Sequence, residues 1–328
     1  MRNSSVELLR FLMMLMLCFW HILMHGYGLK GMDAGTAMPS YNQLALLALL
    51  AFPVDCFIFI SGFYGIKLKW EKVIRLFLQA SFFYLLCVIL RNILHLGSPL
   101  ASGIILVNFL PIANWAWWFL AWYMMLMLLS PIIEQGIRSI SQRQFTMILV
   151  GIVVLNCFGT WLNRLHSGSD FVGLLTIYLI GRYMSQRKPE ISKIKAGLFL
   201  FASTITLLLL LLVTQYTGKI YFTWTLLSFC SPLVVVQAIA MFYLVKGINL
   251  RYTHMFNFLG AHCFAIYLIT EFSGNLFYDW WRKIYECHGL CVMAIAVLSA
   301  SLCFCLLDLT QSMMLRPLNN YLMRKSNK

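Results

Sequence analysis

Long apolar runs separated by short polar stretches follow one another along almost the whole chain. A helix needs about 20 mainly apolar residues to cross the hydrocarbon core of a bilayer. Runs of that kind predict about ten membrane-spanning helices, at residues 6–26, 43–65, 73–95, 113–133, 144–163, 171–187, 196–216, 222–245, 256–278 and 289–314. The expected fold is therefore all-α, a polytopic transmembrane helical bundle.

The polar stretches between these runs are too short to form an aqueous domain. We therefore expect one transmembrane domain over residues 1–328 and no soluble domain. Composition agrees, because 61% of the residues are hydrophobic and only 11% are charged, and the mean hydropathy is +0.80.

Positive charge is distributed unequally between the two sides of the predicted bundle. With ten helices both termini lie on one side, which carries 18 Lys and Arg residues against 6 on the other. Because cytoplasmic segments of membrane proteins are enriched in Lys and Arg, both termini are expected to be cytoplasmic. The same asymmetry explains most of the net charge of +14, so the basic face is expected to meet anionic membrane lipids and no nucleic acid.

The first predicted helix contains two ionisable residues, Arg10 and His21, which enclose ten apolar residues. Helix geometry places them on one face, about 16 Å apart along the axis. Ionisable groups inside a membrane are costly unless they face the bundle interior or a wet cavity, which favours a functional role. Two alternatives remain open: Arg10 could be an interfacial anchor paired with Glu7, and His21 a neutral core histidine. His25 could extend the polar stripe, but no metal is expected.

The second predicted helix adds an acid and two small residues within the run AFPVDCFIFISGFYGIK. Asp55 is an acid inside an apolar segment, and Gly62 lies within about 20° of the same helix face. Asp55, Ser61 and Gly62 are therefore candidates for a binding site, although Ser61 could offer its hydroxyl group or bond back to its own helix. Lys72 and Arg75 belong to the basic cluster that follows, which membrane topology partly explains.

These segments resemble the membrane-bound acyltransferase family three. The shared pattern is the arginine and histidine of the first helix, followed by VDxFxxxSGF in the second helix with basic residues after it. Further similar segments are WWFLAWYMMLMLLSP at 117–131, LIGRYM at 179–184 and FLGAHCFAIYL at 258–268. The family includes bacterial sugar O-acetyltransferases. The resemblance therefore implies an integral enzyme of the bacterial cytoplasmic (inner) membrane that moves an acyl group, usually acetyl, from cytoplasmic acyl-CoA to a hydroxyl of a cell-surface glycan or its precursor.

The chain departs from this family pattern at two places. Many relatives carry a histidine just before the WF pair, where this chain has Ala116 and Trp117. The late helix of relatives commonly has a histidine shortly after YL, where this chain has Thr270 and Glu271. Trp118 and Glu271 are further candidates for the pocket, Trp118 having an interfacial aromatic anchor as its alternative.

The resemblance also implies roles for the charged residues. Arg10, Lys72 and Arg75 would bind the phosphates or amide oxygens of acetyl-CoA or another acyl-CoA. His21 would act as general base on the acceptor hydroxyl, or carry the acyl group as an acyl-histidine. Asp55 would either hold the second nitrogen of the imidazole or pair with Arg10.

A proton-coupled secondary transporter or a flippase of glycan precursors is the main alternative, because such carriers also use intramembrane ionisable residues. Against a carrier, the sequence shows no inverted repeat and no pair of Gly/Pro-broken helices in corresponding halves. A non-catalytic scaffold for polysaccharide assembly is a third reading. The expected partners are acyl-CoA, a polysaccharide or lipid-linked sugar acceptor, and membrane lipids; the sequence predicts no oligomeric state.

Overall fold

A computed structural model describes residues 3–29, 39–93, 117–159, 161, 168–248, 250–272 and 276–317. All regular structure in these ranges is helical, which confirms the all-α prediction. Six segments are long and apolar enough to cross a membrane: Ser4–Gly26, Tyr41–Tyr64, Trp70–Leu90, Trp118–Ser139, Lys193–Tyr216 and Phe277–Met314. Two shorter apolar helices are Gln142–Phe158 and Pro232–Lys246. These segments support a polytopic membrane protein.

Helix α1 (Ser4–His21) lies at the centre of the bundle and continues into a π-helical turn, η1 (Ile22–Gly26). The helix begins after Asn3, whose side chain accepts hydrogen bonds from two backbone N–H groups of the first turn. Leu9 and Met13 of α1 belong to one buried hydrophobic cluster, whereas Met14 and Leu17 belong to a second. The helix therefore separates two packed halves of the molecule.

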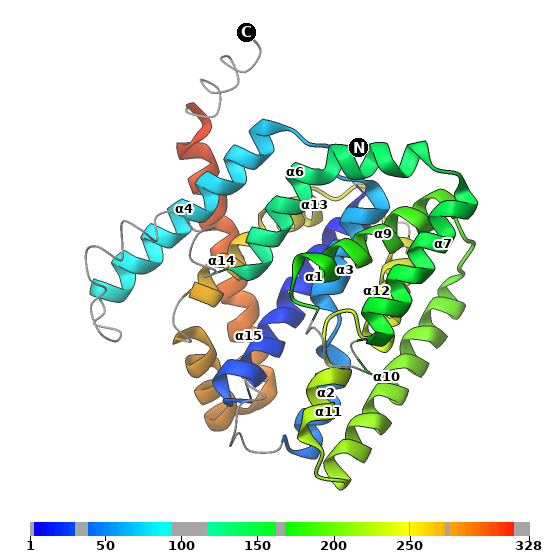
Figure 1. Ribbon diagram of the computed structural model, residues 1–328. Helices are drawn as coiled ribbons and strands as arrows, with labels where there is room; N and C mark the ends of the chain where they lie inside the picture. The colour runs from blue at the N-terminus through cyan, green and yellow to red at the C-terminus, as the bar shows by residue number, and fades with distance from the viewer. Residues whose placement is uncertain are drawn as a thin grey trace.

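Each half is a set of helices around its own cluster. The first half contains α2 (Tyr41–Leu50), α3 (Pro53–Tyr64), α7 (Gln142–Val153) with the π-helical turn η2 (Val154–Phe158), α9 (Phe171–Arg187), α10 (Lys193–Tyr216), α11 (Ile220–Leu226) and α12 (Pro232–Lys246). The second half contains α4 (Trp70–Ile93), α13 (His254–His262), α14 (Phe264–Phe272) and α15 (Leu276–Met314), and α6 (Trp118–Ser139) contributes to both. Figure 1 shows α4, α14 and α15 to the left of α1, and α7, α9 and α10 to its right.

The first and the last described helix segments of the chain end on the same side of the bundle. In Figure 1 the start of α1 and the red end of α15 are both at the upper end of the view. This arrangement agrees with termini on one side of a membrane, and the cytoplasmic orientation stays a prediction.

Helices α3 and α9 cross at very short range because both present glycine at the crossing. A Cβ atom added to Gly62 would run into the backbone carbonyl of Tyr178, and one added to Gly181 would lie 2.7 Å from the carbonyl oxygen of Phe59. Only glycine allows the two backbones to approach this closely. Gly62, predicted as part of a binding site, therefore has a packing role, and Gly181 explains the glycine in LIGRYM.

Two of the predicted spans are broken inside the bundle. The span predicted at 43–65 consists of α2 and α3, with Pro53 at the start of α3. The span predicted at 222–245 consists of α11 and α12, with Pro232 at the start of α12. The structure therefore contains two Pro-broken spans; that they do not occupy corresponding halves of an inverted repeat stays a prediction. Proline is tolerated in the first turn of a helix but disfavours a helical conformation in the residue before it. Hydropathy alone therefore does not show whether an apolar run that contains a proline forms one helix or two.

Candidate functional site

A cavity of about 720 Å³ lies at the end of α1 that carries His21. Its lining residues come from α1, η1, α3, α6, α11 and α14, from the residues just before α9, and from the segment between α11 and α12. Trp20, Phe57, Trp118 and Phe119 line the cavity and also pack against both hydrophobic clusters. The cavity therefore lies where the two halves meet, and its volume is typical of a small-molecule site.

A carboxylate and a phenol hold the imidazole of His21 in this cavity. The Nδ1 atom of His21 is 3.1 Å from Oε2 of Glu271 and 2.9 Å from the hydroxyl oxygen of Tyr278. The Tyr278 hydroxyl also donates to Glu271 at 3.2 Å, and Tyr278 is fully buried. A carboxylate facing Nδ1 favours the tautomer with its proton on that nitrogen, which makes Nε2 the basic atom.

A second imidazole shares the same carboxylate. The Nε2 atom of His25 is 3.9 Å from Oε1 of Glu271, and its ring stacks on Tyr278 with 5.3 Å between centroids. His21, His25 and Glu271 are the one group in the described part of the chain whose ligand atoms, all within 4.8 Å of one another, could hold a metal ion. The expectation of no metal stays a prediction.

Arg10 does not line the cavity that contains His21. Its Nη1 atom is 3.2 Å from Oε1 of Glu7, the ion pair considered as an alternative above. Arg10 lies one turn, about 6 Å, before Met14, which does line the cavity. Its charge also acts on the hydroxyl group of Tyr64 at the far end of α3. Arg10 and His21 therefore lie on the same face of α1, but they do not line the same cavity.

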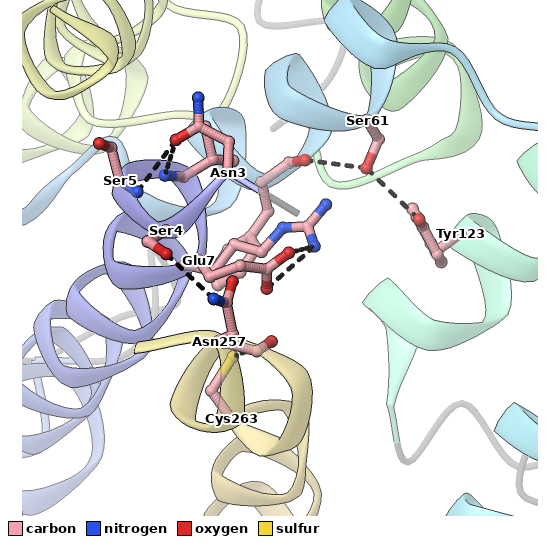
Figure 2. Close-up of polar contacts among 12 residues, drawn as sticks. Asn3, Ser4, Ser5, Glu7, Ser61, Tyr123, Asn257 and Cys263 are labelled. Carbon is pink, nitrogen blue, oxygen red and sulfur yellow. Dashed lines mark hydrogen bonds and ion pairs between the residues drawn. The ribbon is translucent and has the colours of Figure 1, made fainter. Parts of the chain in front are cut away.

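Ser61 does not line the cavity that contains His21. Its hydroxyl group donates to the backbone carbonyl of Phe57 at 3.0 Å and is 3.3 Å from the hydroxyl group of Tyr123 (Figure 2). Ser61 thus bonds back to its own helix, and it also joins α3 to α6. Figure 2 places this pair across from Glu7 and the contact between Ser4 and Asn257.

Asp55 is fully buried outside the cavity. Both of its carboxyl oxygens are buried, and neither has a hydrogen-bond partner among the described residues. Neither role predicted for Asp55 appears in the structure, because Glu271 holds His21 and Glu7 holds Arg10. The break before α3 explains the difference, since Asp55 begins a new helix that faces the start of α12.

A second, smaller cavity of about 400 Å³ lies at the opposite end of α3. It is lined by Tyr64, Gly65, Ile66, Lys67, Leu68, Pro131, Glu134, Gln135, Arg138 and Arg182. Glu134 neutralises Arg182 at 2.8 Å and accepts a hydrogen bond from Tyr178 at 2.6 Å. Lys67 and Arg138 are exposed and make this cavity basic.

Two of the cations predicted to bind acyl-CoA, Lys72 and Arg75, lie outside the basic cavity. Lys72 and Arg75 are exposed on the first turns of α4 and do not line it. Of the predicted site residues, His21, Trp118 and Glu271 therefore meet in the large cavity, and the remaining six do not line it.

Sequence analysis did not find Tyr278, Asp170 or Trp224 as residues of the site. Tyr278 is 257 positions away from the histidine it contacts, and no local pattern marks it. Asp170 begins α9 and accepts a hydrogen bond from the backbone N–H of Gly173. Its position at the start of an apolar run was a usable signal, because aspartate before such a run is typical of a helix N-cap.

Comparison with known proteins gives one result. Searches of curated proteins and of solved structures found no significant match. A family model for the acyltransferase domain of family three matches residues 3–307. The matched region spans all the residues that line the two cavities. The chain therefore belongs to acyltransferase family three, and it is a membrane acyltransferase.

Proposed function

We propose that the chain moves an acyl group, in the simplest case acetyl, from cytoplasmic acyl-CoA to a hydroxyl group of a cell-surface glycan or its precursor. The observation that carries this proposal is the pair of His21 and Glu271, 3.1 Å apart at the wall of the large cavity. A histidine held by a carboxylate is suited to take a proton from a hydroxyl group, because the carboxylate stabilises the imidazolium that forms.

The reaction then has a simple course. The acceptor oxygen attacks the thioester carbonyl carbon while Nε2 of His21 takes the hydroxyl proton. The carbon–sulfur bond breaks, and the thiolate of coenzyme A receives the proton from the imidazolium. In the alternative course, Nε2 attacks the thioester first and an acyl-histidine passes the group to the acceptor. In both courses Glu271 keeps the imidazole in the required tautomer.

The basic cavity supports the assignment of acyl-CoA as donor. Lys67 and Arg138 line it, and such side chains bind phosphate groups. Arg10 lies between this cavity and His21, about 16 Å from the imidazole along α1. An extended thioester arm would pass Arg10 and the Ser61–Tyr123 pair to reach His21. Lys72 and Arg75 would attract the donor from a greater distance.

The proposed orientation assigns each cavity to one side of the membrane. With both termini in the cytoplasm of a bacterial cell, the basic cavity faces the cytoplasmic pool of acyl-CoA. The cavity with His21 then lies in the outer half of the bilayer, where a surface glycan or its lipid-linked precursor would enter.

The carrier alternative has one structural feature in its favour, the two broken spans α2–α3 and α11–α12. Membership of an acyltransferase family favours the enzyme. The experiment below separates the two functions.

Purified protein in lipid nanodiscs is incubated with acetyl-CoA labelled in the acetyl group, and release of the coenzyme A thiol and transfer of label are followed. We expect wild-type protein to release thiol, and His21→Ala to reduce the rate by about 10²-fold or more while acetyl-CoA binding persists. His288→Ala, at an exposed histidine of α15, is the control. A His21→Ala protein with full activity, or a wild type that binds no acyl-CoA, contradicts the proposal; glycan movement without acyl transfer supports the carrier.

A further inference from the structure

Three side chains with metal-binding atoms meet at the wall of the large cavity. They are His21 at the end of α1, His25 in η1 and Glu271 in α14, and their ligand atoms all lie within 4.8 Å of one another. All three line the cavity, and none of them is fully buried. An ion that enters the cavity can therefore reach all three side chains without opening the bundle.

The local backbone brings the two imidazoles together. His21 and His25 are four residues apart, which places them on one face of a helix. The turn that carries His25 is π-helical, since the backbone N–H of Tyr27 bonds to the carbonyl of Ile22, five residues earlier, and such turns are frequent at functional sites. The two imidazole rings meet edge to face with 5.2 Å between their centroids. Two histidines at this spacing on one helix are also how zinc metalloproteases hold their ion.

The distances to the carboxylate are close to those of a metal site. Nδ1 of His21 is 3.1 Å from Oε2 of Glu271, and Nε2 of His25 is 3.9 Å from Oε1. Zinc binds nitrogen and oxygen atoms at about 2.0–2.1 Å in tetrahedral geometry, so that two of its ligands lie about 3.3 Å apart. The two observed distances lie on either side of that value, and small side-chain rotations would equalise them.

The chemistry of the three ligands selects the metal. Imidazole suits zinc, copper and nickel ions, whereas Mg²⁺ and Ca²⁺ are bound through oxygen atoms. Two histidines with one glutamate are a ligand set found in zinc enzymes. The site is therefore suited to Zn²⁺ and poorly suited to Mg²⁺.

We propose that the large cavity binds a zinc ion through His21, His25 and Glu271, and that this ion inhibits acyl transfer. Zinc on Nδ1 of His21 replaces the proton on that atom, which is released to solvent. The two positive charges then oppose the imidazolium that must form when Nε2 takes a proton from the acceptor. The inhibition rests on the proposed function, whereas zinc binding itself does not. The ion takes no part in the proposed reaction, so the prediction that catalysis needs no metal is unchanged.

Zinc binding is measured first, without acyl-CoA, on protein that carries no histidine tag in phosphatidylcholine nanodiscs. The protein carries Cys287→Ser, Cys291→Ser and Cys303→Ser, because these cysteines are exposed and thiolates also bind zinc. We expect calorimetric titration with Zn²⁺ to show one saturable site above the signal of empty nanodiscs. Excess Mg²⁺ should not displace the zinc. Co²⁺ should occupy the same site and show the visible absorption of tetrahedral coordination.

The substitution His25→Gln removes one ligand and leaves His21 and Glu271 in place. We expect its zinc affinity to fall at least about tenfold. His254→Gln, at an exposed histidine of α13, is the matched control and should bind zinc as the parent protein does. His25→Cys supplies a thiolate ligand instead and should restore binding. It should also add a sulfur-to-cobalt absorption band, which a loss of folding does not produce.

Inhibition is then measured at free zinc concentrations set by a chelating buffer. Loss of label from acetyl-CoA is followed, since zinc also binds the thiol that the reaction releases. We expect saturating zinc to lower the rate at least about tenfold and EDTA to restore it. Relative to its own zinc-free rate, His25→Gln should need at least about tenfold more zinc for the same inhibition.

The outcomes separate this inference from the proposed function. The inference is overturned by a lack of saturable zinc binding, by equal zinc affinity in His25→Gln and His254→Gln, or by zinc binding that leaves acyl transfer unchanged. A zinc-free wild type that removes no acetyl group from acetyl-CoA overturns the proposed function. In that case the calorimetric and cobalt measurements still decide whether the zinc site exists.

Discussion

Glu271 is the residue on which the geometry of the site depends. Its carboxylate contacts the imidazole of His21, the hydroxyl group of Tyr278 and, at longer range, His25. One partly buried carboxylate thus contacts side chains from α1, η1 and α15. The resemblance placed a histidine near this position in relatives, and here a carboxylate takes that place and contacts the imidazole of His21.

Replacing Glu271 by Gln tests this role directly. The amide keeps the size of the side chain but cannot stabilise an imidazolium, so we expect kcat for acyl transfer to fall about 10²-fold. The KM for acetyl-CoA should change little, because Glu271 does not line the basic cavity. Steady-state kinetics at several acetyl-CoA concentrations measures both constants.

Glu286→Gln is the control for this substitution, since Glu286 is an exposed acid on α15. An unchanged kcat in Glu271→Gln, or an effect on KM alone, would contradict the assignment.

The cations in and near the basic cavity provide a second test at this scale. Lys67 and Arg138 line the basic cavity, whereas Lys72 and Arg75 lie outside it. We expect Lys67→Gln combined with Arg138→Gln to raise the KM for acetyl-CoA on the order of tenfold at low salt, and less at high salt. The pair Lys72→Gln with Arg75→Gln should have a smaller effect, because these cations act only at a distance. A larger effect of the second pair would show that Lys72 and Arg75, the residues predicted from the sequence, bind the donor.

At the scale of the element, the contact between α3 and α9 positions the site. α3 carries Phe57 at the large cavity and Tyr64 at the basic cavity. Its close approach to α9 depends on Gly62 and Gly181. The SGF motif therefore acts by placing the helix that joins the two cavities.

A pair of glycine substitutions tests this packing role. Gly62→Ala should lower the stability by about 1–3 kcal/mol, because the added methyl group meets the backbone of α9. Gly136→Ala should raise it by about 0.5 kcal/mol, because an added Cβ meets no atom there and alanine favours the helix. Thermal unfolding in detergent, followed by tryptophan fluorescence, measures both shifts. A Gly62→Ala protein as stable as the wild type would show that α3 and α9 can separate freely.

At the scale of the whole molecule, two packed halves meet along α1 (Figure 1). A cavity lies where they meet. Arg10 and His21 lie on one face of this shared helix, about 16 Å apart along its axis. Such an arrangement lets a donor from one side and an acceptor from the other reach one imidazole, provided that the chain has the predicted orientation.

Cysteine labelling tests the orientation in intact cells. Cys287 and Cys291 are exposed near the end of the molecule that carries His25, and we expect a membrane-impermeant maleimide to label them from outside. A cysteine introduced by Glu190→Cys, between α9 and α10, should react only after the membrane is opened. This substitution is introduced into a variant from which Cys287 and Cys291 have been removed. The reverse pattern would invert the assignment of the two cavities to the two sides.

The sequence by itself determined the fold class, the membrane environment and the family, because a bilayer demands long apolar helices and the family pattern lies in short local motifs. His21 was visible as an ionisable residue inside an apolar run, and Glu271 was a candidate through the family resemblance; the roles of both residues stay predictions. Only the tertiary structure decided the partners: Glu271 and Tyr278 for His21, and Glu7 for Arg10. Pairings between distant positions follow from how helices pack and where they break, and hydropathy along the chain records neither.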